Sequence, residues 1–214
     1  MPGKFYEIAV TDSVRKAQEH YFGRPHNFQT HPECDPLTEE EIQFIQARDS
    51  FYMATVTETG WPYIQHRGGE RGFLRVLSPA QLAFADYSGN RQMLSTGNLA
   101  ANDRVALFLM DYPRRERLKI LGHARVEDAC EHRELVAQLA EPEARSRVER
   151  LFFIDIASFD WNCPKYITPR YTVAEMEQVV APLRQRIAEL EAQIKNDPHS
   201  MTEPTQYEML HRYS

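Results

Sequence analysis

Three short segments between Trp61 and His123 constrain the fold of this chain most strongly. Residues 63–67 and 81–85 have the length and composition of strands, and each ends in a polar corner that contains glycine. Residues 104–110 are apolar at both alternating sets of positions, so we expect a central strand that is buried on both faces. The sequence therefore predicts a buried sheet with polar, arginine-containing loops at the strand ends.

Composition limits the class of protein. The chain has 214 residues, of which 42% are hydrophobic, and this is enough for one large β-barrel domain with helical attachments. Its formal net charge of −6 argues against a nucleic-acid surface, which needs a basic face. No apolar stretch is long enough to span a bilayer, and residues 1–10 lack the order of a secretory signal. With three widely spaced cysteines, these features predict a cytoplasmic protein without a membrane or nucleic-acid partner.

Further strands and helices flank the three segments. Residues 51–57 are rich in aromatic and β-branched types and lead through Gly60 into the strand at 63–67, which is a hairpin pattern. Strand patterns also occur at 73–77, 117–126 and 151–156, and helix patterns at 12–21, 38–48, 92–101 and 130–140. Strands in runs, with helices at the corners, predict a mainly β protein with helices (α+β), built as a closed or nearly closed antiparallel barrel.

Two capping boxes, Thr38 with Glu41 and Thr172 with Glu175, predict helix starts. The second opens a C-terminal helix that we expect to pack on the body or on a partner subunit, because its apolar residues repeat at spacings of four and three: Met176, Val180, Leu183, Ile187, Leu190 and Ile194. Pro182 is expected to kink or restart this helix. We therefore divide the chain into an N-terminal helix and loop (1–37), a barrel domain (38–171) and a C-terminal helix with a polar tail (172–214).

The loop at 24–36 contains His26, His31 and Cys34, which are residue types that bind metals. No cluster with ligand spacing elsewhere in the sequence completes such a site, and short patterns of this kind arise by accident. The sequence favours an ordinary loop, and we predict no metal site.

Four motifs in a fixed order carry a resemblance to a known family. They are GWPYIQHRGG, FADYSGNR, NDRVALFLMDY and ERLKILGHARV, each at a predicted strand end. From about Thr38 to Arg170, the chain resembles the FMN-binding split-barrel family that includes pyridoxamine 5′-phosphate oxidase. It is most similar to a branch whose members are predicted to bind flavin nucleotides. The resemblance implies a split barrel and a homodimer with two FMN sites at the subunit interface.

The phosphate of FMN requires paired cationic groups and close backbone N–H donors, because a guanidinium can grip two oxygens at once. Arg67 beside Gly68 and Arg91 beside Asn90 meet this requirement. In the family, cationic residues at these two places hold the phosphate, so the resemblance assigns that role to Arg67 and Arg91. Ser95, one helical turn beyond Arg91, adds a candidate hydroxyl donor.

The resemblance also implies contacts to the flavin ring. Family members reach the ring from the strand ends that correspond to Gln65, His66, Asp86 and Tyr87. Arg117 falls where related enzymes place a polar residue near the pyrimidine edge. A cation there would stabilise the negative charge of the reduced flavin.

The motif SFDWNCPKYITPRY at 158–171 follows the last predicted strand. Oxidases of the family contribute a Trp and an Arg from this region to the partner subunit's flavin, which indicates Trp161 and Arg170. The sequence around the tryptophan departs from theirs, so the resemblance does not define the substrate. Lys165 is a candidate for binding an anionic substrate, and Cys163 is either a reactive thiol or, as the commoner case, a packed cysteine.

Two functions fit these features. The first is an FMN-dependent oxidoreductase acting on a small molecule, in which the flavin does the chemistry and we predict no catalytic residue of the protein. His66 is the nearest candidate for proton transfer. The second is a non-catalytic protein that binds or senses a flavin nucleotide, haem or a deazaflavin. Structural readings also stay open: surface ion pairs for Arg67 and Arg91, core anchors for Trp61 and Trp161, and a bulge at Gly68 and Gly69.

Overall fold

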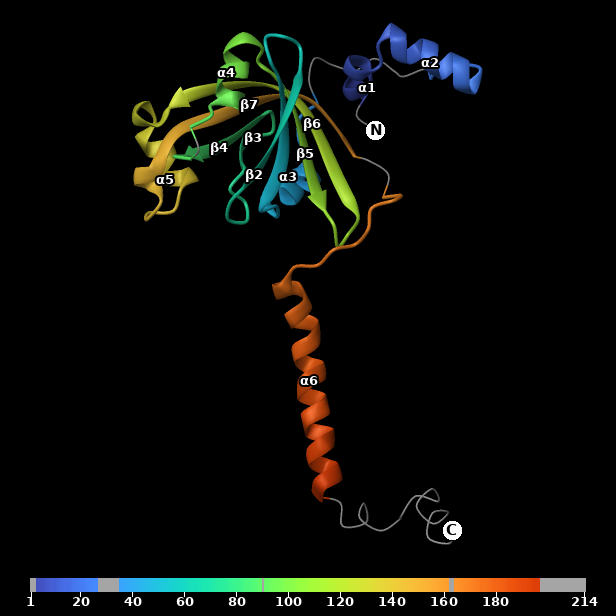
Figure 1. Cartoon of the computed structure of the whole chain (residues 1–214), viewed down its shortest axis with the longest axis vertical. Coiled ribbons are helices and arrows are strands. Elements are labelled where there is room, and N and C mark those ends of the chain that lie inside the picture. Colours follow the sequence, from blue (N-terminus) through green and yellow to red (C-terminus); the bar gives the residue numbers. More distant parts are fainter. Residues whose placement is uncertain (1–2, 27–34, 90, 162–163, 197–214) are drawn as a thin grey trace, which may run out of the picture. The chain divides into compact units, whose positions relative to one another are not determined.

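The computed structural model describes residues 3–26, 35–89, 91–161 and 164–196 (Figure 1). The chain divides into two compact units, Met1–Pro169 and Arg170–Ser214. The first unit contains every strand of the described residues, and the second contains one long helix. None of the helices in the described part of the chain is both long and apolar enough to cross a membrane.

Seven strands form one antiparallel sheet, which confirms the predicted mainly β fold with helices. They are β1 (Ser50–Val56), β2 (Pro62–Gly68), β3 (Arg75–Ser78), β4 (Gln81–Tyr87), β5 (Arg104–Asp111), β6 (Glu116–Asp128) and β7 (Val148–Trp161). Their order is β2-β1-β5-β6-β7-β4-β3, and the sheet curves into a barrel (Figure 1). The barrel is split because β2 and β3, at the two ends of this order, are not neighbours among the described residues.

The interior of the barrel is filled by aromatic and aliphatic side chains from every long strand. Phe84 on β4 and Phe152 on β7 are almost completely buried, and their rings stack with centroids 4.8 Å apart. Phe51 on β1 meets Phe84 edge to face at 5.5 Å. Burying each such ring contributes about 1.5–3 kcal/mol before entropy is counted. These three rings belong to one cluster in the core of the barrel.

The expectation that the strand at 104–110 is buried on both faces is wrong. In β5 the residues at one set of alternating positions are buried, whereas Ala106, Phe108 and Met110 on the other side are only partly buried. Two neighbouring strands are instead buried on both faces over part of their length, β4 at positions 82–85 and β7 at positions 151–154. The reason is that α5 (Arg133–Leu139) covers the outer face of β4 and β7 with Val136 and Leu139, and no described helix covers β5 in this way.

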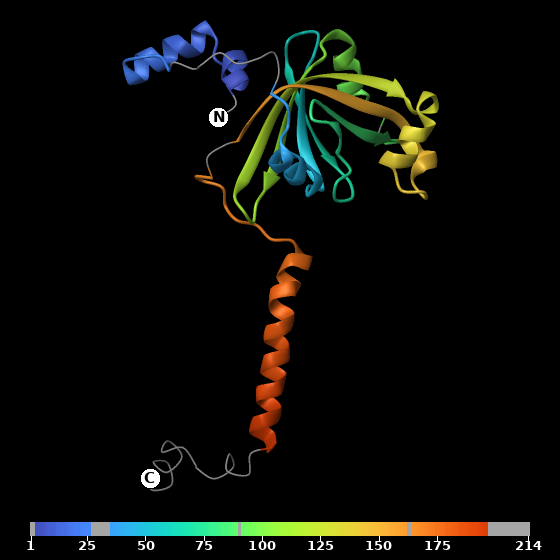
Figure 2. The ribbon, with the colours of Figure 1, turned by 180° about the vertical axis from the view of Figure 1, so that it is seen from behind.

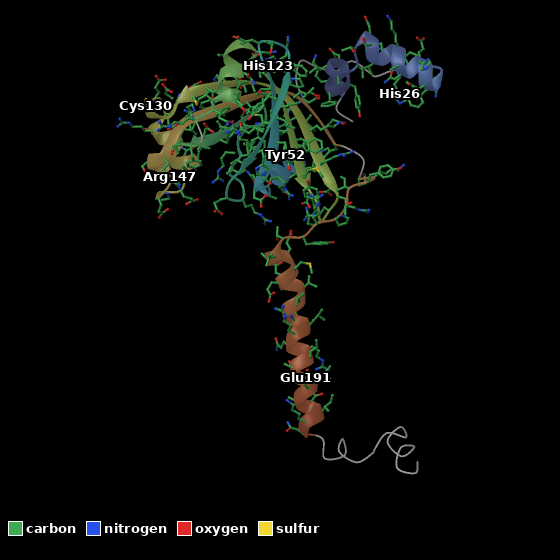
Figure 3. All side chains as sticks on the ribbon, viewed as in Figure 1. His26, Tyr52, His123, Cys130, Arg147 and Glu191 are labelled. Carbon is green, nitrogen blue, oxygen red and sulfur yellow. The ribbon has the colours of Figure 1, made fainter. Side chains whose placement is uncertain are left out.

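The outer face of β5 continues into an apolar hollow of about 620 Å³. Side chains of four adjacent strands line it, together with Phe5 from the N-terminal helix α1 (Gly3–Ala9). The strand residues are Tyr52, Ala54, Ile64, Ala106, Leu107, Phe108, Lys119, Ile120 and Leu121, and Tyr112 completes the set. Tyr52 lies on this face of β1 (Figure 3). We call this surface the apolar sheet face.

The described residues contain six α-helices and two 3₁₀ turns, whereas five helices were predicted. Helix α2 (Asp12–Phe22) was expected, whereas α1 was not; both are drawn in dark blue in Figure 2. Helix α3 (Glu39–Gln46) begins at the predicted capping box. Helix α4 (Leu94–Ala101) starts two residues later than expected because Met93 has a φ of 55°, which lies outside the helical region. The helix expected at 130–140 is a 3₁₀ turn (Ala129–Glu131) followed by α5, and a second 3₁₀ turn (Arg145–Arg147) precedes β7.

The junction of β6 and β7 requires a glycine. A Cβ atom at Gly122 would lie 2.6 Å from the backbone oxygen of Asp155 and 3.0 Å from Cγ2 of Ile154. The β6–β7 register shifts between Leu121 and Gly122, which is a bulge. The close approach of the two backbones therefore excludes any side chain at this position.

The second unit contains α6 (Val173–Asn196). Its predicted capping box is confirmed, because the backbone N–H of Thr172 donates to Glu175 at 2.8 Å and the backbone N–H of Glu175 donates to Thr172 Oγ1 at 3.2 Å. Pro182 lies inside the helix, which continues as a single element and does not restart. No described residue of α6 is buried.

Candidate functional site

A polar cleft of about 280 Å³ opens where four segments of the first unit meet. They are the inner face of β2, the end of β4 with the corner that follows it, the start of α4, and the start of β7. The lining residues are Tyr63, Gln65, Arg67, Asp86, Tyr87, Gly89, Arg91, Gln92, Met93, Leu94, Ser95, Thr96, Glu149 and Arg150. The cleft thus brings together six of the residues predicted from sequence: Gln65, Arg67, Asp86, Tyr87, Arg91 and Ser95.

One carboxylate holds two guanidinium groups at the floor of this cleft. Arg67 Nη1 donates to Asp86 Oδ1 at 2.8 Å, and Arg150 donates to Asp86 Oδ2 through Nη2 at 2.8 Å and Nε at 3.1 Å. Each of the three side chains is only 14% or 15% exposed. The pairing follows from the β4–β7 register, which places Asp86 opposite Arg150. Asp86 therefore holds the guanidinium groups of Arg67 and Arg150 close together. Two like charges would repel each other at this distance without a shared counter-ion.

Arg67 has one donor, Nε, that no described residue accepts. Its guanidinium lies over the rings of Phe152 and Phe84, with the central carbon 5.0 Å and 5.5 Å from their centroids. Its Nε atom is buried and has no hydrogen-bond partner among the described residues. A buried N–H without a partner costs about 1–3 kcal/mol, and a bound anion would remove that cost.

The segment before α4 has an uncommon backbone. Arg91 and Met93 have φ values of 58° and 55°, in the left-handed region that residues other than glycine rarely adopt. The side chain of Arg91 is exposed and makes no hydrogen bond or ion pair with any described residue. The turn leads directly into α4, and Leu94 and Ser95, the first residues of that helix, line the cleft. Backbone strain of this kind is typical of ligand-binding turns.

Ser95 does not present a free hydroxyl to the cleft. Its Oγ donates to Oε1 of Gln65 at 2.9 Å, and the residue is 2% exposed. The bond ties α4 to β2 and orients the amide of Gln65. A second bond of the same kind, from Asn98 Nδ2 to Thr55 Oγ1 at 2.8 Å, ties α4 to β1.

The cleft is cationic in a chain whose total charge is negative. Three guanidinium groups (Arg67, Arg91 and Arg150) and two carboxylates (Asp86 and Glu149) line it, which leaves one net positive charge. Burial lowers the pKa of Arg150, but hydrogen bonds and charge from Asp86, with a further contribution from Glu149, raise that pKa above its ordinary value overall. Arg150 therefore stays charged.

Sequence reasoning missed Arg150 and Glu149. We predicted that the last strand begins at 151, whereas β7 begins at Val148. The missed residues lie at the start of that strand, and Arg150 is 64 positions from Asp86 in sequence. No pattern of neighbouring residues predicts that Arg150 pairs with Asp86. The sequence showed only that an arginine stands next to an apolar segment.

Other predicted residues lie away from the cleft. His66 is on the opposite side of β2 from Gln65 and Arg67, and its ring meets Tyr52 at 5.4 Å on the apolar sheet face. Gly68 does not line the cleft, and the neighbouring glycine, Gly69, makes room for Phe73, since a Cβ there would lie 2.8 Å from Cγ of that ring. Arg117 is on β6, where its guanidinium lies 6.0 Å from the ring of Phe108.

The predicted motif at 158–171 provides no described residue of the cleft. Trp161 donates from Nε1 to Glu41 at 2.6 Å and packs edge to face on Phe44 at 4.8 Å, so it behaves as an anchor of the core. Trp61, in contrast, is 74% exposed and is therefore not part of the core. Lys165 is exposed, and Arg170 belongs to the second unit. Asn90, Cys163, His31 and Cys34 lie outside the described residues.

The bond between Trp161 and Glu41 leads to a prediction about acid stability. Burial raises the pKa of Glu41, but hydrogen bonds from Thr38, Trp161 and backbone N–H groups lower it below the ordinary 4.5 in sum. A lowered folded-state pKa stabilises the protein above pH 4.5 and loses this contribution as the pH falls through the folded value. We expect Glu41→Gln to be less stable than wild type at neutral pH, with a difference that shrinks in acid. Urea unfolding of both proteins at neutral and acid pH measures the difference in their free energies of unfolding. A difference that does not change with pH would contradict the prediction.

Comparison with known proteins decides the family. Residues 37–156, more than half of the chain, match the family model described as pyridoxamine 5′-phosphate oxidase. The chain belongs to this family. The matched region includes all seven strands except the end of β7, and every residue of the cleft. No curated protein gives a significant match.

Several solved structures are similar to part of this chain. A variant of HupZ from Group A Streptococcus is 16% identical, with a TM-score of 0.46 over 58% of this chain and 98% of that one. A putative pyridoxamine 5′-phosphate oxidase from Lactobacillus delbrueckii is 22% identical, with a TM-score of 0.45 over 58% of this chain and 93% of that one. An FMN-binding protein from Syntrophomonas wolfei is 9% identical, with a TM-score of 0.41 over 58% and 87%.

Proposed function

We propose that this member of the pyridoxamine 5′-phosphate oxidase family binds FMN with its phosphate in the polar cleft. The observation that carries the proposal is the cluster of Arg67, Arg91 and Arg150, of which two are held side by side on Asp86. A phosphate dianion fits this arrangement because guanidinium groups offer paired N–H donors in the geometry of its oxygens. The buried Nε of Arg67, unpaired among the described residues, is one such donor.

The start of α4 strengthens the fit. Its first N–H groups have no partner within the helix, and the helix dipole places partial positive charge at this end. Anions bind at helix N-termini for these reasons. The cleft therefore combines side-chain cations with backbone donors, which is the combination that a phosphomonoester requires. In this proposal Tyr87 and Gln65 contact the polar parts of the ligand that extend from the phosphate.

We propose that a second copy of the chain covers the apolar sheet face and that each flavin lies at this interface. Tyr52 and Ile64 are 39% and 64% exposed on that face, although they are large and apolar. Contiguous apolar surface of this kind marks an interaction site. Strand β2 is at the edge of the sheet, with Gln65 on the cleft side and His66 on the side of the apolar face. Both sides of β2 then contribute to one site at the dimer interface.

The remaining predicted residues keep their proposed roles toward the ring and the substrate. These are His66, Gly68, Asn90, Arg117, Lys165 and Arg170. For Trp161, the contacts with Glu41 and Phe44 favour the alternative of a core anchor. FMN, when bound, supplies reversible two-electron chemistry, so the protein is proposed to be an oxidoreductase that acts on a small molecule. The chain's own residues bind the phosphate, orient the ring and exclude water; none is assigned a catalytic role.

Absorbance spectroscopy of the purified protein tests the proposal. We expect the protein to show a flavin spectrum as isolated or after addition of FMN. Under anaerobic conditions, we expect a reduced nicotinamide or another electron donor to bleach the flavin absorbance. A Soret band in place of flavin bands would indicate the haem-binding alternative. A flavin that is bound but never turned over by a broad donor panel would support a binding or sensing protein. A protein that binds no FMN at all would refute the assignment of the cleft.

A further inference from the structure

The long helix α6 carries a narrow apolar stripe, and no residue of the helix itself is buried. Along the stripe Val180 is partly exposed, and the other large apolar side chains range from 41% exposed at Leu190 to 62% at Ile194. Ion pairs within the helix, such as Arg186 with Glu189 at 3.1 Å, stabilise its polar surface. The apolar surface, in contrast, gains nothing from the helix alone.

The stripe follows the heptad rule of coiled coils. Val180, Ile187 and Ile194 occupy position a, and Met176, Leu183 and Leu190 occupy position d. β-Branched residues at a with leucine at d favour two parallel strands over larger assemblies. Pro182 falls at position c, on the side of the helix away from the stripe. The helix therefore has the core of a parallel two-stranded coiled coil.

The positions beside the stripe argue against packing on a sheet or a globular body. A helix on such a surface needs a broader apolar face that includes position e or g. Here position e holds Glu177, Arg184 and Glu191, all charged, and Val179 is the single apolar residue at position g. A stripe restricted to a and d matches the width of one partner helix.

Charge decides the orientation of the two helices. In a parallel pair, position g of one helix faces position e of the next heptad of the other, so Arg186 meets Glu191 of the second copy, and the reverse. In an antiparallel pair e faces e and g faces g. Arg184 would then lie near Arg184 of the second copy, and Arg186 near Arg186 of the second copy. Both pairs bring like charges together and are repulsive.

We propose that α6 pairs in parallel with α6 of a second copy of this chain, as a two-stranded coiled coil. The stripe covers fewer than three heptads, so an isolated pair of this length is weak. The pairing rests on the dimer proposed above, because joining two barrels raises the effective concentration of the helices. A parallel pair has the same two-fold symmetry as a barrel dimer.

Disulfide trapping in the full chain tests the pairing. In a background with Cys34, Cys130 and Cys163 changed to Ser, Leu190→Cys places a thiol at position d, where like residues of parallel helices face each other. We expect oxidation to give a covalent dimer roughly 100-fold faster than for Ala192→Cys, a control at the outward position f. Equal rates for the two variants, or no dimer from Leu190→Cys, would overturn the proposal. A third outcome would also overturn it. If a mixture of the Val180→Cys and Leu190→Cys proteins formed the mixed disulfide in preference to either like pair, the helices would be antiparallel.

A charge exchange provides the second readout. Adding Arg186→Glu to Leu190→Cys is expected to slow the trapping, and adding Glu191→Arg as well is expected to restore it. The rescue cannot come from within the helix, since the partner of Arg186 there is Glu189. Failure of the rescue would count against the parallel register. Flavin absorbance measured on the same samples separates the two proposals, because trapping with no bound flavin would refute the cleft and keep the helix pair.

Discussion

Arg67→Gln is expected to weaken FMN binding by roughly 10- to 100-fold. A hydrogen bond to a charged group contributes about 1.5–3 kcal/mol, and about 1.4 kcal/mol corresponds to a factor of ten in affinity. The fold is expected to survive, because Asp86 keeps its bonds to Arg150 and is not left as an unpaired buried carboxylate. Titration calorimetry or fluorescence quenching of FMN measures the change in dissociation constant.

Riboflavin and a distant arginine serve as controls for this prediction. Riboflavin lacks the phosphate, so its affinity is expected to be nearly the same for wild type and Arg67→Gln. Arg104→Gln removes an exposed arginine that does not line the cleft, and its FMN affinity is expected to equal that of wild type. If Arg67→Gln weakened riboflavin as much as FMN, the phosphate would not lie beside Arg67.

Phe152→Ala is expected to lower the free energy of unfolding by about 3–5 kcal/mol, the range for removing a buried phenylalanine ring. Phe152 is 0% exposed, stacks on Phe84 at 4.8 Å and lies below the guanidinium of Arg67 at 5.0 Å. Its removal leaves a cavity and also removes part of the surface that supports Arg67. We therefore expect weaker FMN binding as well as lower stability.

Trp61→Ala is the matched control for the loss of an aromatic ring. Trp61 is 74% exposed, and substitutions at such positions usually change the free energy of unfolding by less than about 0.5 kcal/mol. Urea denaturation followed by circular dichroism compares the two variants. Similar losses of stability for both would show that Phe152 does not hold the centre of the core.

Much of the fold is encoded in patterns that are local in sequence. The capping boxes at Thr38 and Thr172 form as expected, because a cap depends on residues three positions apart. The strands at 63–67 and 104–110 lie where alternation and composition indicate. Errors of one to five residues occur at element ends such as the start of α4 and both ends of β7, where tertiary contacts override the local signal.

The candidate site was only partly predictable. Arg67 and Arg91 were identified because glycine-containing corners mark the turns where a backbone approaches a ligand. Gln65 and His66 lie on opposite sides of β2, because successive side chains of a strand point to opposite faces. The family resemblance assigned both residues to the flavin ring without taking this alternation into account. Arg150 was missed, since its position beside Asp86 depends on the register of two strands far apart in sequence.

By itself the sequence determined the mainly β class, the helix caps, the glycine-containing corners and the heptad stripe of α6, all of which depend on neighbours within a few residues. Only the tertiary structure decided that Asp86 joins Arg67 to Arg150, that α5 buries the second face of β4, and that the outer face of β5 is left partly exposed. The physical reason is that strand order and register, which place distant residues together, arise from the packing of the whole barrel and leave no mark in any single segment.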